Sequence, residues 1–251
     1  MSQWALKGYG GPVGITGGED LLLHVRGDIG TFEDAAGTDA CEDADVLAEW
    51  QDLAVSPDNL EQDGAGSQPT WQAAELNGLG VAQFDGGDFM EGNFAGKLRD
   101  MFDTYTLQAV ANPTNFTAAR ALIGTEDMAR ADIFVQIQIT DGFVRVYSGA
   151  EDAYATASTT ALTAGSYKIL TIQNEPGVNL RYYVNNVAAG TATAQDYTTA
   201  PRPDDTSYRL GGQAGGNGFL GFIAEHLLYK VILNSVQLAT NQSTLANRWG
   251  L

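Results

Sequence analysis

The sequence predicts an all-β protein that folds as an antiparallel sandwich of two sheets. Short alternating apolar runs recur along the chain at the spacing of about 8–12 residues that is typical of sandwich strands. The 251 residues include 30 glycines and ten each of Phe and Tyr, a composition that favours many turns and strands. No long segment has helical periodicity. At 44% hydrophobic residues, the chain can bury the core of a single domain of this length.

The first expected strands have clear boundaries. Residues 21–26 (Leu-Leu-Leu-His-Val-Arg) form the first one, and residues 105–111 form a strand with alternating residues. Residues 133–139 place aliphatic side chains on one face and mainly glutamines on the other. Asp141 and Gly142 follow, and then residues 143–147, so this segment predicts a β-hairpin with a tight Asp-Gly turn.

Residues 166–173 and 180–184 are expected to form a second hairpin around the turn at residues 174–177. Asn185 and Asn186 then turn the chain into Val187. Asn accepts a positive φ angle, which suits a tight turn at this point.

The central strand is expected near the end of the chain, at residues 218–229. It follows a turn that is rich in glycine (Gly211, Gly212, Gly215, Gly216 and Gly218). Strict alternation assigns Phe219, Ile223, Leu227 and Tyr229 to one face, and Leu220, Phe222, Ala224 and Leu228 to the other. Both faces are apolar, so this strand should be covered on both sides. The predicted core between the sheets includes Ile133, Val135, Ile137, Ile139, Ile223 and Leu227.

The two ends of the chain differ from this pattern. Leu238, Leu245 and Trp249 recur at a spacing that predicts a short closing helix. Residues 8–18 form a glycine-rich arm without periodicity, and Trp4 and Leu6 precede it. We therefore expect an arm at residues 1–18 and the sandwich at residues 19–251. Ordering such an arm costs about 1–2 kcal/mol per residue, so it needs a surface to pack on, either a neighbouring subunit or its own domain.

The net charge of −18 limits the classes of partner. Nucleic-acid binding needs Lys and Arg at the phosphates, and anionic membrane also attracts basic segments, so neither partner is expected. The acidic surface fits simple solvation or a basic partner surface. We expect neither a cleaved signal peptide nor a membrane span, because the first residues lack an apolar core and no run of about 18 apolar residues exists.

Several motifs together resemble the concanavalin A-like lectin/glucanase (laminin-G-like) domains. They are Trp-x-Asp at residues 50–52, Gln-Pro-Thr at 68–70, Asn-Gly at 77–78, Phe-Asp-Gly at 84–86, and Phe-x-Gly-x-Ile-Ala-Glu-x-Leu-x-Tyr at 219–229. The resemblance covers about residues 20–251 and implies a jelly-roll sandwich. Asn186 departs from the family pattern, because it stands where related hairpins have Gly. Similar domains occur in many phage and bacterial surface proteins.

The catalytic motif of the related glucanases is absent. Those enzymes carry Glu-x-Asp-x-x-Glu on one strand, so that one carboxylate attacks and another donates a proton. Glu61-Gln62-Asp63 begins this pattern, but Gly66 stands where the second Glu should be. Neither a Gly-x-Ser-x-Gly elbow nor a phosphate-binding glycine loop occurs. We therefore expect a protein that is not an enzyme, with no catalytic and no cofactor-binding residues.

The sequence leaves metal binding undecided. His24 and His226 lie in strands far from the single cysteine, Cys41, which favours structural histidines over a zinc site. Glu225 lies in an apolar strand, where a buried carboxylate needs hydrogen bonds or a calcium ion.

The acidic loop at residues 28–45 is not an EF-hand. Ala44 stands where that loop needs Gly, and Trp50 where it needs a bidentate Glu. A looser calcium site at this loop stays open, against a plain solvated loop, so metal ligands remain unassigned.

Glycan sites in this kind of fold combine aromatic rings with polar donors and acceptors. The candidates near expected turns and strand ends are Tyr147, Tyr154, Tyr197, Tyr208 and Asn217. Tyrosines of this kind are often simply half-buried sheet surface, so the sequence assigns no site.

Two functions follow from the resemblance. The first is a non-catalytic structural protein on a virion surface, such as a phage capsid decoration, head-fibre or tail-associated subunit. Its partners would be capsid or tail proteins, further copies of itself, and a cell-surface glycan. The alternative is a free-standing carbohydrate-binding module of a bacterial surface or secreted protein. The sequence names neither the glycan, the oligomeric state nor the host.

Overall fold

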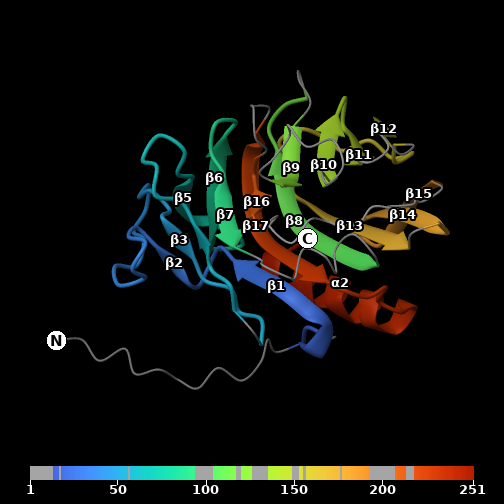
Figure 1. Cartoon of the computed structure of the whole chain (residues 1–251), viewed down its shortest axis with the longest axis horizontal. Helices are drawn as coiled ribbons and strands as arrows, with labels where there is room; N and C mark the ends of the chain where they lie inside the picture. The colour runs from blue at the N-terminus through green and yellow to red at the C-terminus, as the bar shows by residue number, and fades with distance from the viewer. Residues whose placement is uncertain are drawn as a thin grey trace.

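The computed structural model of the chain describes residues 14–16, 18–55, 57–93, 104–116, 120–125, 135–148, 153–154, 157–175, 177–192, 207–212 and 218–251. Two antiparallel sheets pack against each other, and α2 (Ser235–Trp249) covers the outer face of one of them (Figure 1). The predicted all-β sandwich with a short C-terminal helix is thereby confirmed. Among the residues described, no helix has the length and apolar character that a membrane span requires.

The sheet under the helix is called sheet A, and the other is called sheet B. A short 3-10 turn (Gly18–Asp20) precedes the first strand. Sheet A has the order β15 (Val187–Ala192), β14 (Asn179–Val184), β13 (Lys168–Glu175), β8 (Tyr105–Pro113), β17 (Leu220–Tyr229), β6 (Leu79–Asp85) and β5 (Thr70–Leu76), with β1 (Leu21–Arg26) paired to the second half of β17. Sheet B has the order β12 (Ala153–Tyr154), β11 (Phe143–Ser148), β10 (Val135–Thr140), β9 (Arg120–Thr125), β16 (Ser207–Leu210), β7 (Met90–Asn93), β4 (Leu60–Glu61), β3 (Glu49–Trp50) and β2 (Thr31–Phe32).

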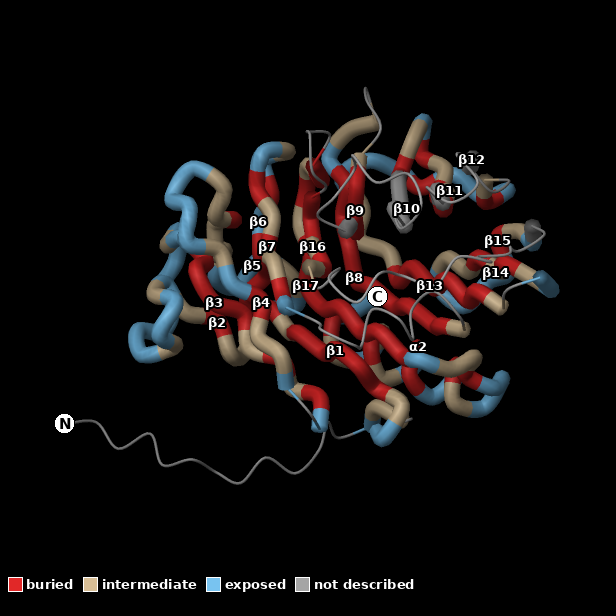
Figure 2. Tube along the Cα trace, in the orientation of Figure 1, coloured by how far each residue is buried: buried red, intermediate tan, exposed pale blue. Residues whose placement is uncertain are grey.

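Strand β17 lies at the centre of sheet A and is buried on both faces, as its sequence predicts (Figure 2). It pairs with β8 along one edge and with β6 and then β1 along the other. One face contributes Ile223 and Leu228 to the core between the sheets. The other contributes Leu227 and Tyr229 to a second apolar cluster beneath α2.

The predicted core set is correct in part. Ile139 and Ile223 lie between the sheets, but Leu227 lies under the helix. The register of β17 against β8 shifts between Ile223 and Glu225, because a β-bulge inserts an extra residue there. Strict alternation therefore fails after Ile223, and the later residues change faces. Ile133 and the side chains of Val135 and Ile137 lie outside the described residues.

Both predicted hairpins are present, because β10 pairs with β11 and β13 pairs with β14, and the further turn expected at Asn185 and Asn186 is present as well. Asp141 and Gly142 have φ angles of 53° and 82° and join β10 to β11. Asn185 and Asn186 have φ angles of 48° and 65° and join β14 to β15. The second pair shows how Asn replaces the glycine of related hairpins, because Asn tolerates this left-handed region.

Glycine is required at two places around β17. Gly211 has a φ of +83°, and a Cβ atom there would lie 2.2 Å from the Phe84 ring. Gly221 has a φ of +147°, and a Cβ atom would lie 2.1 Å from the carbonyl oxygen of Asn112. The glycine-rich sequence thus lets the chain approach the neighbouring strand and the core aromatics closely.

Helix α2 buries one side on sheet A. Leu238, Leu245 and Trp249 belong to the cluster beneath it, as predicted. Asn234 begins the helix with a capping box: its side-chain oxygen accepts hydrogen bonds from the backbone N–H groups of Val236 and Gln237. Gly250 ends the helix in the left-handed conformation.

The last residues of the N-terminal arm lie against α2. The Thr16 N–H donates to Asn241 Oδ1 at 2.8 Å, and the Thr244 hydroxyl donates to the Gly14 carbonyl at 2.9 Å. Ile15 packs against the cluster under the helix. This part of the arm therefore uses its own domain as a surface. The remainder, residues 1–13, lies outside the described residues, and its expected partner stays a prediction.

Candidate functional site

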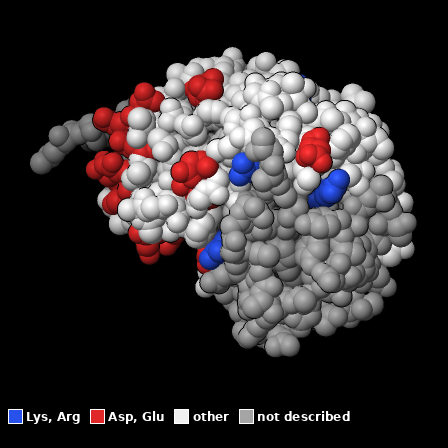
Figure 3. Space-filling model, turned by 90° about the horizontal axis from the view of Figure 1, so that it is seen from above, with Lys and Arg blue, Asp and Glu red and all other residues white. Residues whose placement is uncertain are grey.

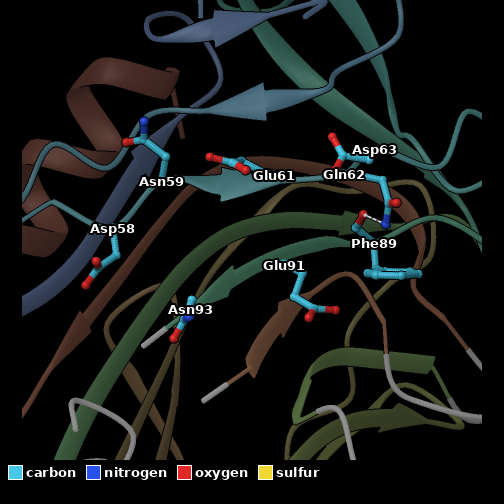
Figure 4. Close-up of a pocket in the computed structure, with 8 residues that line it drawn as sticks. All are labelled: Asp58, Asn59, Glu61, Gln62, Asp63, Phe89, Glu91 and Asn93. Carbon is cyan, nitrogen blue, oxygen red and sulfur yellow. Dashed lines mark hydrogen bonds between the residues drawn. The ribbon is translucent and has the colours of Figure 1, made fainter. Parts of the chain in front are cut away.

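A cavity of about 480 Å³ lies against β4 and β7 of sheet B. Figure 4 shows residues 58–63 along one of its sides and β7 along the other. Its lining combines four carboxylates, three amides and one aromatic ring: Asp58, Glu61, Asp63, Glu91, Asn59, Gln62, Asn93 and Phe89. A concave site that pairs an aromatic side chain with a few polar groups is typical of ligand binding.

Strand alternation places the cavity on the outer face of sheet B. Leu60 and Met90 point into the core, so their neighbours Glu61 and Glu91 point outward. The register pairs Glu61 with Glu49 on one side and with Glu91 on the other. Glu91 in turn pairs with Arg209 on β16. A row of three glutamates and one arginine therefore crosses four adjacent strands.

Phe89 is held in place immediately before β7. Its N–H donates to the carbonyl of Ser67 at 3.0 Å, and its carbonyl accepts from Gln62 Nε2 at 3.2 Å. The Arg209 guanidinium lies over the ring, 4.2 Å from its centroid. This cation–π contact fixes the ring at the wall of the cavity.

The glutamates of the row have different environments. Glu91 accepts hydrogen bonds from Arg209 Nε at 2.7 Å and from the Ser207 hydroxyl at 2.8 Å. Glu49 is buried and accepts from Asn59 Nδ2 at 2.9 Å. Burial, together with the nearby charge of Glu61, raises the pKa of Glu49 above its usual value. The carboxylate of Glu61 is exposed at the cavity.

A family model described as the concanavalin A-like lectin/glucanases superfamily matches residues 66–239. The chain belongs to this superfamily. Comparison with curated protein sequences found no match. This concanavalin A-like protein thus shares its fold with the family that its motifs resemble.

Solved structures with a similar fold include toxin binding domains and a sialidase. The receptor binding domain of botulinum neurotoxin C/D mosaic serotype matches with a TM-score of 0.63 and 11% identity, over 93% of this chain and 55% of that one. The binding domain of botulinum neurotoxin serotype D/C matches with a TM-score of 0.58 and 9% identity, over 91% and 53%. Trypanosoma rangeli sialidase in complex with sialic acid matches with a TM-score of 0.59 and 14% identity, over 92% and 33%.

This concanavalin A-like domain spans about half or less of those three structures. At identities this low, the similarity of these structures establishes the concanavalin A-like fold alone.

The tyrosines that the sequence suggested do not form this site. Tyr208 is fully buried, and its hydroxyl lies 2.6 Å from His226 Nε2 inside the sandwich, so it was wrong as a glycan contact. Tyr147 on β11 pairs with Tyr154 on β12. The side chains of these two tyrosines lie outside the described part of the structure. Tyr197 and Asn217 are also outside the described residues.

Glu225 and the two histidines are structural. Glu225 and His24 are fully buried, and His24 Nε2 lies 2.7 Å from the Glu225 carboxylate. Trp249 Nε1 donates to the same carboxylate at 2.7 Å, and the Arg248 guanidinium also binds it. The prediction of buried, hydrogen-bonded histidines and a buried Glu225 is confirmed.

The acidic loop uses several carboxylates to organise its own backbone. Asp34 accepts from the N–H groups of Thr38 and Asp39, and Asp45 accepts from the N–H of Glu42. Asp43 accepts from the N–H of Ala73 on β5. Within the part of the chain that the structure describes, no group of three or more His, Cys, Asp or Glu side chains could hold a metal ion. The calcium hypothesis stays untested.

Proposed function

We propose that this protein is a non-catalytic glycan-binding protein, and that it holds a sugar on the outer face of sheet B. The observation that carries the proposal is the cavity in which a fixed aromatic ring, Phe89, lies beside carboxylates and amides. An aromatic ring packs against the apolar C–H groups of a sugar. Carboxylate oxygens accept hydrogen bonds from its hydroxyl groups.

The geometry of the glutamates favours binding over hydrolysis. Glycoside hydrolysis needs one carboxyl group that donates a proton and a second that acts as nucleophile or base. Glu91 already accepts hydrogen bonds from Arg209 and Ser207, so its carboxylate is engaged within the sheet. Glu49 has a raised pKa but is only 5% exposed and lies behind Asn59. These environments support a role of the three glutamates in binding a sugar.

Replacement of Phe89 by alanine is expected to weaken glycan binding about tenfold or more, since it removes the ring from the wall of the cavity. A glycan microarray would identify the ligand, and isothermal titration would then compare the variant with the wild type. Phe222→Ala is the matched control, because it removes a half-buried ring on the outer face of sheet A. Melting temperatures of both variants would separate lost binding from lost folding. Unchanged binding by Phe89→Ala would contradict the proposed site.

We propose further that the protein is a virion surface subunit, a capsid decoration, head-fibre or tail-associated protein that the N-terminal arm joins to a neighbour. The glycine content of the arm supports this setting, because the arm is too rich in glycine to order itself. The contacts with α2 described above are made by Gly14 and Thr16, at the end of the arm. A surface subunit can also bind a cell-surface glycan, so the two proposals are compatible.

Removal of residues 1–13 is expected to leave the sandwich folded and to abolish self-association or particle binding. Gly14 to Thr16 and their contacts with α2 are retained in this variant, so the cluster under the helix stays covered. Light scattering would compare the oligomeric state of the full and shortened chains, and sedimentation with phage particles would test attachment. If both chains were monomeric and neither bound particles, the free-standing carbohydrate-binding module would be favoured instead.

A further inference from the structure

We propose that the cavity on sheet B selects glycans that carry free ammonium groups, such as chains of glucosamine, and rejects glycans that carry carboxylates. This inference rests on the proposed glycan site and names the class of sugar it takes. It follows from the carboxylates that surround Phe89 and from which of them already accept hydrogen bonds within the protein.

Negative charge dominates the cavity. Four carboxylates line it, and no Lys or Arg is among the described residues of its lining. Glu61 and Asp63 are exposed, and within the described part of the chain their carboxylates accept no hydrogen bond. Two exposed carboxylates that accept no hydrogen bond, beside an aromatic wall, favour a ligand that brings positive charge and N–H donors.

The chain itself shows how this wall accommodates a cation. The Arg209 guanidinium lies over the Phe89 ring while its Nε donates to Glu91. A carboxylate and a π face thus hold one positive group together. Glu61 faces Glu91 across the β4–β7 pair, so the same kind of acceptor lies one strand away at the cavity.

The surroundings extend this negative field. Residues 18–93 contain 18 Asp and Glu residues but no Lys and a single Arg, Arg26, which is paired with Asp28. Figure 3 shows acidic side chains gathered at one end of the molecule, on the left, where Figure 1 places β2, β3 and β5. A surface of one sign raises the local concentration of oppositely charged ligands and opposes ligands of the same sign.

Three oligosaccharides of equal length would test the inference in isothermal titrations: oligomers of glucosamine, of N-acetylglucosamine and of galacturonate. At a pH where the amines are protonated, we expect glucosamine chains to bind about tenfold more tightly than the acetylated chains, as one charge-assisted hydrogen bond predicts. Galacturonate chains should show no binding. Added salt should weaken the binding of glucosamine chains and leave that of the acetylated chains unchanged.

A double variant would locate the selectivity. Glu61→Gln with Asp63→Asn keeps the shape of the cavity and should remove the preference for glucosamine, so that glucosamine and acetylated chains bind this variant with equal affinity. Glu75→Gln is the matched control, because Glu75 is exposed on β5 of sheet A. The Glu75→Gln variant should prefer glucosamine chains over acetylated chains to the same degree as the wild type.

The outcomes separate the two proposals. Equal binding of glucosamine and acetylated chains, abolished by Phe89→Ala, would overturn the ammonium selectivity and leave the glycan site intact. Tight binding of galacturonate chains would also overturn it, and so would a preference that survives the double variant. Loss of binding to all three sugars together with an empty microarray would instead refute the proposed glycan function.

Discussion

Replacement of Glu225 by alanine is expected to lower the free energy of unfolding by about 3–5 kcal/mol, because it leaves buried charged and polar partners unpaired. Glu225 is fully buried and joins three elements through one carboxylate. His24 on β1 lies 2.7 Å away, and Trp249 Nε1 at the end of α2 donates at 2.7 Å. Arg248 supplies a further charged donor.

The pKa of Glu225 indicates how strong these contacts are. Burial alone raises the pKa of a carboxyl group, but the hydrogen bonds and charges of His24 and Arg248 hold the pKa of Glu225 below its usual value. The ionised carboxylate is therefore the form that the fold requires. Without it, Arg248 and Trp249 in the last turn of α2 lose their hydrogen bonds to β17.

Urea denaturation at neutral pH would measure the loss of stability. Glu75→Ala provides the control, since an exposed carboxylate on a strand should change stability by no more than about 0.5 kcal/mol. A loss below about 1 kcal/mol for Glu225→Ala would contradict the prediction and show that the contacts of Glu225 are not needed to hold the helix.

The same strand shows how far the fold could be read from the sequence. Alternation and glycine turns were enough to predict a central β17, the two hairpins and the closing helix. The bulge after Ile223 was not predictable, because nothing in Ala224-Glu225 marks an inserted residue. The N–H of Gly27 donates to the Ala224 carbonyl at 2.7 Å, so a contact with a distant segment accompanies the bulge. Leu227 was assigned to the wrong side for this reason.

The candidate site was harder to predict than the fold. Phe89 is a single aromatic residue after a turn, and the sequence gives no sign that it borders a cavity. Its neighbours at residues 58–63 come from a distant part of the chain. The pairing of Glu61 with Glu91 joins them, and β4 is only two residues long, too short for a periodic pattern. A tyrosine near a turn was a misleading signal, because Tyr208 faces the core.

Stability is expected to fall steeply below pH 6.5, and His226 is one definable cause. This side chain is fully buried between the sheets, and burial lowers its pKa to about 3. The Tyr208 hydroxyl, 2.6 Å away, is suited to donate to the neutral imidazole Nε2. The folded state therefore keeps His226 neutral at a pH where the unfolded chain binds a proton.

The sign of the effect follows from proton linkage. The unfolded imidazole has a pKa of 6.5, so the full stability is present above that pH and is lost as the pH falls toward about 3. The loss from this one group amounts to about 1.4 kcal/mol per pH unit within the window. Carboxylates contribute to the same slope, so the wild type has to be compared with a variant that lacks the imidazole.

His226→Gln is suited to that comparison, since its amide can still bind the Tyr208 hydroxyl but has no proton to gain. Urea denaturation between pH 7.5 and 4.5 should give the variant a shallower dependence of unfolding free energy on pH, by about 1.4 kcal/mol per unit below pH 6.5. The variant is expected to be less stable at pH 7.5, and the difference should shrink as the pH falls. Parallel curves would show that His226 also binds a proton in the folded protein. That result would contradict the prediction, because the apolar core around Leu228 and Tyr208 should exclude a charged imidazole.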